Sequence, residues 1–160
     1  MNHRITIIIV VLILLVTGIV MIPDIRFNNS IKTMPRLWER NKKLFEGVAD
    51  TLLSLEGLVC VEKTTYDPGF SDVFFYDGLR FRGKLNHDTL EIIHDIFYSL
   101  RSNIGLFEIV KYEEGYIGFL WRHFWWTSLF FVYDPRPDKS YSQYVLLHEL
   151  ANNWYIAKSS

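Results

Sequence analysis

The ten residues Val73-Phe74-Phe75-Tyr76-Asp77-Gly78-Leu79-Arg80-Phe81-Arg82 decide the fold class of this chain. An Asp-Gly pair between two runs of apolar and aromatic residues is the strongest short-range signal of a β-hairpin, because both central positions of such a turn need a positive φ. We therefore predict strands at 73–76 and 79–82, paired antiparallel. Arg80 and Arg82 alternate with Phe81, so the two arginines are expected on one exposed face of the second strand.

On both sides of this hairpin, short apolar segments separated by turn residues predict further strands. They lie at 58–64, 106–112, 116–122, 124–133 and 154–157, while 146–150 is ambiguous. The stretch at 124–133 is apolar almost throughout, which is typical of a strand buried on both faces.

Two segments have the period of an amphipathic helix. Pro35 suits the first turn of a helix at 35–56, which Gly57 ends. Asn86 is a good N-cap for a second helix at 87–102. Strands joined by short turns favour antiparallel pairing. We therefore predict an α+β domain, in which two amphipathic helices cover one face of a mostly antiparallel sheet.

The eighteen residues from Ile5 to Ile22 carry no charged side chain. As an α-helix they would span roughly 27 Å, close to the thickness of the hydrocarbon core of a bilayer. We interpret 5–22 as a transmembrane anchor, between a tail at 1–4 and a linker at 23–34 that leads to a single domain at 35–160. The alternative is a cleaved signal peptide, but the run exceeds the usual length of about 7–15 apolar residues and no small-x-small cleavage site follows it.

This interpretation predicts a single-pass protein of the cell membrane, held by a signal-anchor, with the lipid bilayer as a partner. Six lysines and arginines lie between Asp24 and Lys43, against Arg4 and the terminal amine before the run. By the positive-inside rule, this count favours a cytoplasmic domain, although Asp24 is the charge nearest to the run.

The rest of the chain is acidic. Ten basic and sixteen acidic residues lie between Leu44 and Ser160, a net charge of −6. Because no basic patch interleaved with aromatic residues is present, the sequence predicts no nucleic-acid partner.

The clearest set of possible metal ligands is His87, Glu91 and His94, on the second predicted helix. At 100° per residue these side chains lie within about 60° of one another, and imidazole with carboxylate suits zinc, iron or nickel. The same positions lie opposite the apolar stripe of the helix, where surface helices carry polar residues. A solvated helix face is therefore the alternative interpretation.

Other reactive residue types lack the pattern that their chemistry needs. The stretch from His148 to Asn152 begins like the His-Glu-x-x-His of zinc proteases, but Asn152 replaces the second histidine. Cys60, the single cysteine, lies between Val59 and Val61 and is expected to be a buried, inert thiol. We predict no catalytic residue and no cofactor.

The predicted interaction surface consists of Arg80, Arg82, Trp121, Trp125 and Trp126. Tryptophans within a dense apolar strand commonly pack in the core, but exposed ones are typical of protein-binding surfaces. We therefore predict that the α+β domain binds a protein partner at the membrane, in an accessory, inhibitory or immunity-type role. The alternatives are a membrane-tethered metal-dependent enzyme that uses the histidine-bearing helix face, and a lipid- or small-ligand-binding domain with an apolar pocket.

Overall fold

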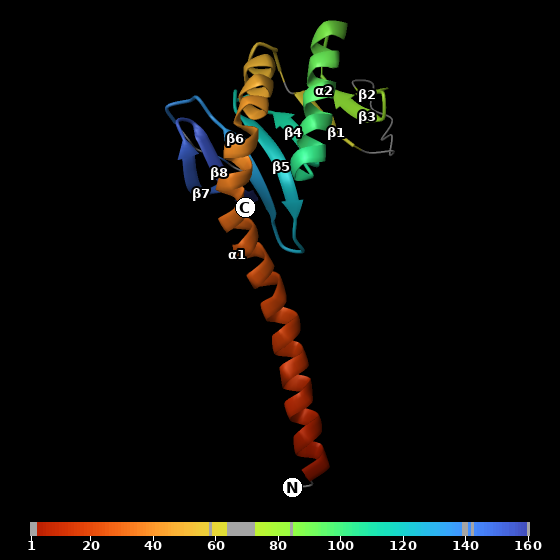
Figure 1. The fold of residues 1–160 in the computed structure, drawn as a ribbon, viewed down its shortest axis with the longest axis vertical. Coiled ribbons are helices and arrows are strands. Elements are labelled where there is room, and N and C mark those ends of the chain that lie inside the picture. Colours follow the sequence, from red (N-terminus) through yellow and green to blue (C-terminus); the bar gives the residue numbers. More distant parts are fainter. Residues whose placement is uncertain are drawn as a thin grey trace. The chain divides into compact units, whose positions relative to one another are not determined.

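The computed structural model describes residues 3–57, 59–63, 73–83, 85–138, 141 and 143–159, although the side chains of 3–8, 13–23 and 74 are outside the described part. The elements within it follow the order α1 (His3–Leu53), β1 (Val59–Glu62), β2 (Val73–Tyr76), β3 (Leu79–Arg82), α2 (His87–Ile104), β4 (Glu108–Lys111), β5 (Ile117–His123), β6 (Ser128–Tyr133), β7 (Tyr144–Ala151) and β8 (Trp154–Ser159) (Figure 1). The chain divides into two units, Met1–Met34 and Pro35–Ser160.

The first unit is helical from His3 onwards, so the segment at 23–34, expected to be a linker, is helical as well. In the described part of the chain, no helix has the length and apolar character that a bilayer span requires. The predicted transmembrane anchor at 5–22 is therefore wrong, and so are the single-pass, signal-anchor and cell-membrane assignments that depended on it. The helix does not end where the apolar run ends at Ile22. It continues through polar residues as part of the 51-residue helix α1.

The second unit is built on an antiparallel sheet with the strand order β2-β3-β1-β4-β5-β6-β8-β7. This confirms the α+β class and the antiparallel sheet. The hairpin of β2 and β3 has the predicted bounds, with Tyr76 opposite Leu79 and a positive φ at both Asp77 and Gly78. The ambiguous segment at 146–150 belongs to β7, and the first four residues of the strand predicted at 124–133 form a turn instead.

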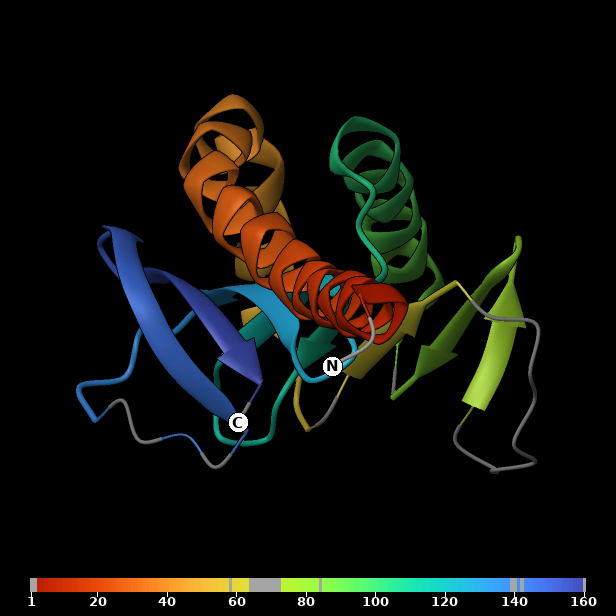
Figure 2. The ribbon, with the colours of Figure 1, turned by 90° about the horizontal axis from the view of Figure 1, so that it is seen from below.

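Helix α2 and the part of α1 in the second unit lie on the same face of the sheet (Figure 2). Phe45 of α1 is central to this core, because its ring packs against Phe119 of β5, Phe131 of β6 and Trp154 of β8 at centroid distances of 5.1, 4.9 and 5.7 Å. Helix α2 contributes Leu90, Ile93, Phe97 and Leu100, all buried. The amphipathic pattern of both helices is thus satisfied by the sheet.

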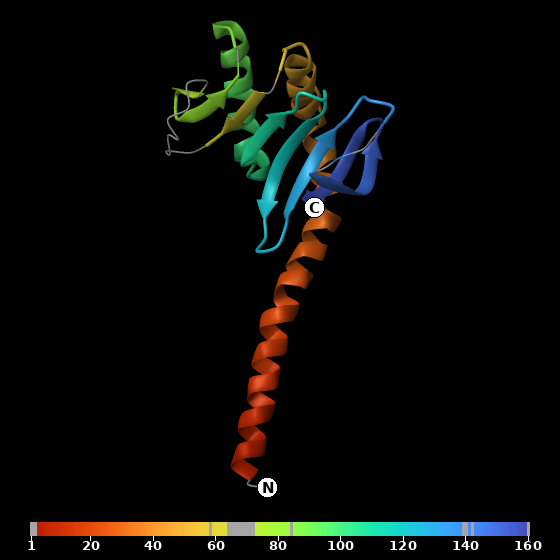
Figure 3. The ribbon, with the colours of Figure 1, turned by 180° about the vertical axis from the view of Figure 1, so that it is seen from behind.

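The opposite face of the sheet, seen from behind in Figure 3, carries a second core that is rich in tyrosine. Neighbouring residues of a strand point to opposite faces, so Gly118 and Val132 lie on this side. Its buried members are Tyr116, Val132, Tyr144, Tyr155 and Ala157.

The segment between β6 and β7 is attached to this second core by a buried carboxylate. Asp134 is fully buried and accepts hydrogen bonds from the Arg136 guanidinium, at 2.9 Å, and from the Tyr141 hydroxyl, at 2.6 Å. The Arg136 guanidinium also lies 4.5 Å from the centre of the Tyr116 ring. Because both faces of the sheet are covered around β6, Phe131 and Val132 are both fully buried, as predicted for that strand.

Candidate functional site

The turn between β5 and β6 presents two tryptophans to solvent. Trp125 is 90% exposed and Trp126 is 50% exposed. The backbone beneath them is held firmly, because the Phe124 N–H donates to the Thr127 carbonyl at 2.7 Å and the Thr127 hydroxyl donates to the Ser159 carbonyl at 3.1 Å. The turn thus combines a fixed backbone with exposed indole rings.

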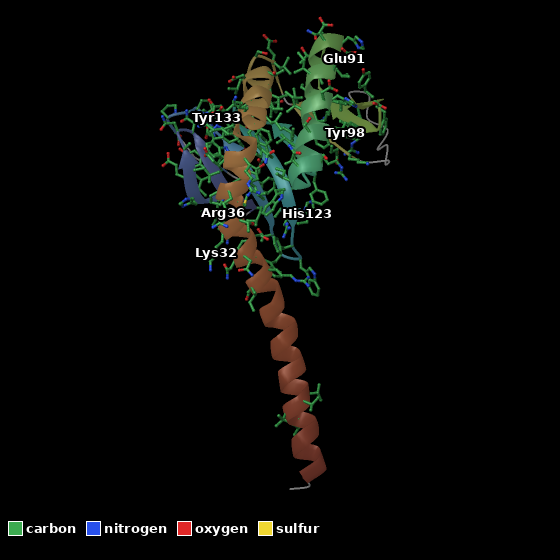
Figure 4. All side chains as sticks on the ribbon, viewed as in Figure 1. Lys32, Arg36, Glu91, Tyr98, His123 and Tyr133 are labelled. Carbon is green, nitrogen blue, oxygen red and sulfur yellow. The ribbon has the colours of Figure 1, made fainter. Side chains whose placement is uncertain are left out.

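Phe107, distant in sequence, joins the same surface. Its N–H donates to the Leu120 carbonyl at 2.9 Å, and its half-exposed ring lies 5.6 Å from the imidazole of His123. Figure 4 shows His123 at the lower end of β5, next to the turn. We call Phe107, His123, Phe124, Trp125 and Trp126 the aromatic turn patch.

Trp121, the third predicted tryptophan, belongs to the core and not to this patch. It is 3% exposed, and its indole N–H donates to the Ile104 carbonyl at 2.7 Å. The bulge between Leu120 and Arg122 interrupts the alternation of β5. Arg122 and His123 separate this tryptophan from the other two in the sequence, and they mark the end of the strand that holds Trp121.

Arg80 and Arg82 lie at a different place on the sheet. Both are on β3, and β1 and β4 separate that strand from β5. Arg80 is half-buried and forms an ion pair with Glu62 of β1, while Arg82 is exposed. The structure therefore divides the predicted surface in two, and only Trp125 and Trp126 lie in the aromatic turn patch.

Cys60 lies in a polar cluster beside these arginines. Its thiol donates a hydrogen bond to Glu108 Oε1 at 3.2 Å. Within the described residues, one group of side chains has the spacing of metal ligands. Its ligand atoms all lie within 4.8 Å of one another, and they belong to Cys60, Glu62 and Glu108. Burial, and then the charge of Glu108, raise the pKa of the Cys60 thiol. The cluster therefore holds a protonated thiol, which is a poor nucleophile and a poor metal ligand.

The predicted metal ligands of α2 form two separate contacts. His87 Nε2 lies 3.4 Å from Glu91 Oε1, and both side chains are exposed. His94 is mostly buried, with Nδ1 3.1 Å from Asp95 Oδ1. Its Nε2 lies 3.2 Å from Asp77 Oδ2, without the alignment of a hydrogen bond.

The β2–β3 turn thus places a carboxylate close to His94, and the spacing of residues within the helix does not predict this contact. The Tyr98 hydroxyl donates to the Asp77 carbonyl at 3.1 Å, so α2 contacts this turn twice. Glu91 and Tyr98, labelled in Figure 4, lie at different levels of α2. Metal binding by His87, Glu91 and His94 stays a prediction.

The segment from His148 to Asn152 lies on β7 and its turn, with His148 and Glu149 exposed. The zinc-protease motif that it resembles at its start requires a helix, which places two histidines on one face. A strand points alternate side chains to opposite faces, so this segment has neither the residues nor the backbone of that motif.

A groove lies between α1 and the β7–β8 turn. Its volume is about 710 Å³. The lining residues are Lys42, Glu46, Ala49, Asp50, Tyr133, Ala151, Asn152, Asn153 and Trp154. Most of these side chains are polar, so the groove differs from the apolar pocket expected for a lipid-binding domain.

Comparison of the chain with models of protein families, with curated proteins and with solved structures found no match. The function of this chain is therefore inferred from the geometry of these sites.

Proposed function

We propose that this chain is a binding protein, and that its second unit recognises a partner protein through the aromatic turn patch. The observation that carries the proposal is the 90% exposure of Trp125 on a firmly held turn. Complete burial of a tryptophan removes about 150–250 Å² from water, worth about 4–6 kcal/mol at about 25 cal/mol per Å². A partner surface that buried the ring would gain the part of this free energy that remains after the entropy cost of association.

The composition of the patch also supports a protein partner. Tryptophan is enriched among the residues that dominate the binding energy of protein interfaces. Because the Phe124–Thr127 and Thr127–Ser159 hydrogen bonds already order the backbone, binding would lose little conformational entropy there. The patch is small, so we expect it to form the centre of a larger interface.

The test compares partner recovery by three forms of the full chain, each expressed with an affinity tag in the source cells. Trp125→Ala/Trp126→Ala should lower the recovery of a stoichiometric partner by roughly 30-fold or more, the expected effect of losing a binding hot spot. Phe75→Ala is the matched control, because Phe75 is a half-exposed aromatic residue on β2, outside the patch. That variant should recover the partner as the wild type does.

Circular dichroism of the double variant checks that the fold is retained. Equal recovery by the double variant and the wild type would contradict the proposal. So would binding of the wild type to phosphatidylcholine vesicles with no protein recovered, because the patch would then face lipid.

A further inference from the structure

The groove between α1 and the β7–β8 turn has the size of a ligand site. Its volume of about 710 Å³ falls within the range of about 300–1,000 Å³ that is typical of small-molecule sites. Figure 4 shows Tyr133 beside the turns of α1 that form one wall. The opposite wall is the turn formed by Asn152 and Asn153.

The α1 wall carries more negative than positive charge. Glu46 and Asp50 are one helical turn apart, so both side chains lie on the groove side of the helix. Lys42 Nζ lies 3.9 Å from Glu46 Oε1 and offsets that carboxylate in part. Among the described residues no basic side chain pairs with Asp50, which is exposed, so the wall favours a positively charged ligand.

The opposite wall offers neutral groups that suit the same ligand. Asn153 has a φ of 66°, a conformation that asparagine tolerates, and its carbonyl accepts a hydrogen bond from the Asp134 N–H at 2.8 Å. This bond holds the turn in place beside the groove. The ring of Tyr133, 4.9 Å from that of Trp154, is partly exposed, and such a ring attracts cations through its face.

We propose that this groove binds an extended organic cation. Glu46 and Asp50 pair with its ammonium or guanidinium groups, the side-chain oxygen of Asn152 accepts a hydrogen bond from it, and the ring face of Tyr133 contacts one of its charged groups. Such a cation is either a free polyamine or an arginine side chain of another protein. The site is separate from the aromatic turn patch, and the inference does not depend on the proposed function.

The test is isothermal titration calorimetry of the full-length chain at low ionic strength. The two probes are spermidine, for a free polyamine, and a capped tripeptide with a central arginine, for a protein side chain. We expect Glu46→Gln/Asp50→Asn to raise the dissociation constant by about tenfold or more, because charged hydrogen bonds are lost. Glu39→Gln is the matched control, because it removes one negative charge from an exposed position of α1 outside the groove.

Binding of either probe that the double variant loses and Glu39→Gln retains supports the proposal, and the preferred probe identifies the source of the cation. Three results would overturn it: no heat from either probe at about 1 mM, equal affinity in the double variant, or an equal loss in Glu39→Gln. Trp125→Ala/Trp126→Ala should leave the binding of both probes unchanged. This last comparison separates a failure of the groove from a failure of the aromatic turn patch.

Discussion

The second core leaves no room for a side chain at Gly118 of β5. A Cβ at this position would overlap the hydroxyl of Tyr144, and that hydroxyl lies 2.5 Å from the hydroxyl of Tyr112. Because Tyr144 is buried and must shift away from the new Cβ, which disturbs its contact with Tyr112, Gly118→Ala is expected to lower the free energy of unfolding by roughly 1–3 kcal/mol. Urea denaturation followed by tryptophan fluorescence measures the change.

Two further variants make this prediction specific. Gly47→Ala is the control, because a Cβ there would meet only Ile96 Cδ1 at an ordinary 3.9 Å. In a helix interior, that change is expected to stabilise the protein by roughly 0.5–1 kcal/mol. Adding Tyr144→Phe to Gly118→Ala removes the overlapping oxygen, and should recover part of the loss. A Gly118→Ala variant as stable as the wild type would show that the tyrosines have room to move.

At the scale of the element, helix α2 has well-defined ends. Asn86 Oδ1 accepts a hydrogen bond from the Thr89 N–H at 2.8 Å, and Gly105 ends the helix in the left-handed conformation. Asn86→Ala removes the cap and is expected to lower the free energy of unfolding by about 0.5–2 kcal/mol. Asn86→Asp keeps an acceptor and should retain most of the stability. Thermal denaturation by circular dichroism compares the three proteins, and equal midpoints for Asn86→Ala and the wild type would contradict the capping role.

Some contacts of α2 can be predicted from the sequence of the helix, and others cannot. The helical period identified the buried face of α2, because that pattern is local in sequence. It also placed His87, Glu91 and His94 on one polar face. The pairing of His94 with Asp77 depends on the β2–β3 turn reaching the helix, and no spacing within the helix encodes that contact.

For the whole molecule, the second core predicts how stability depends on pH. Burial alone raises the pKa of Asp134, but the hydrogen bonds from Arg136 and Tyr141 outweigh it, and the pKa is lowered. Burial raises the pKa of Tyr116 to about 12. In the unfolded chain these groups have ordinary pKa values of about 3.9 and about 10.

The sign of each effect follows from which state binds the proton. The contribution of Asp134 is complete above its unfolded pKa, and is lost as the pH falls from about 4 toward its lower folded pKa. The contribution of Tyr116 is complete below about pH 10, and is lost as the pH rises to about 12. We therefore expect a plateau of unfolding free energy at neutral pH, with a decline on each side.

Urea denaturation across this pH range tests both declines. Asp134→Asn should flatten the acid decline, whereas Glu113→Gln, at an exposed turn, should not. Tyr116→Phe should reduce the alkaline decline without abolishing it, because burial also raises the pKa of Tyr141 and Tyr144. An alkaline decline of the same size in Tyr116→Phe and the wild type would show that Tyr116 ionises equally in both states.

The N-terminal helix shows how hydropathy of a short window misleads. The run at 5–22 has the length and apolarity of a span when it is taken alone, and that local property was the basis of the predicted anchor. In the structure the run is continuous with the rest of α1, and the described part of this helix does not qualify as a span. The length of helix α1 thus depends on residues outside the apolar segment 5–22.

The sequence by itself determined the α+β class of the second unit, the β2–β3 hairpin and helix α2. The Asp77-Gly78 turn, the cap at Asn86 and the helical stripe are all encoded within a few residues, because backbone preference and side-chain period act locally. The tertiary structure decided which aromatic residues are exposed. Trp121 is buried and Trp125 is exposed because strand pairing, the β5 bulge and the packing of Phe107 join residues that are far apart in the chain. The sequence proposed Trp125 and Trp126 as surface residues, but the addition of Phe107 to the aromatic turn patch and the groove beside α1 both arise from long-range contacts that no local pattern encodes.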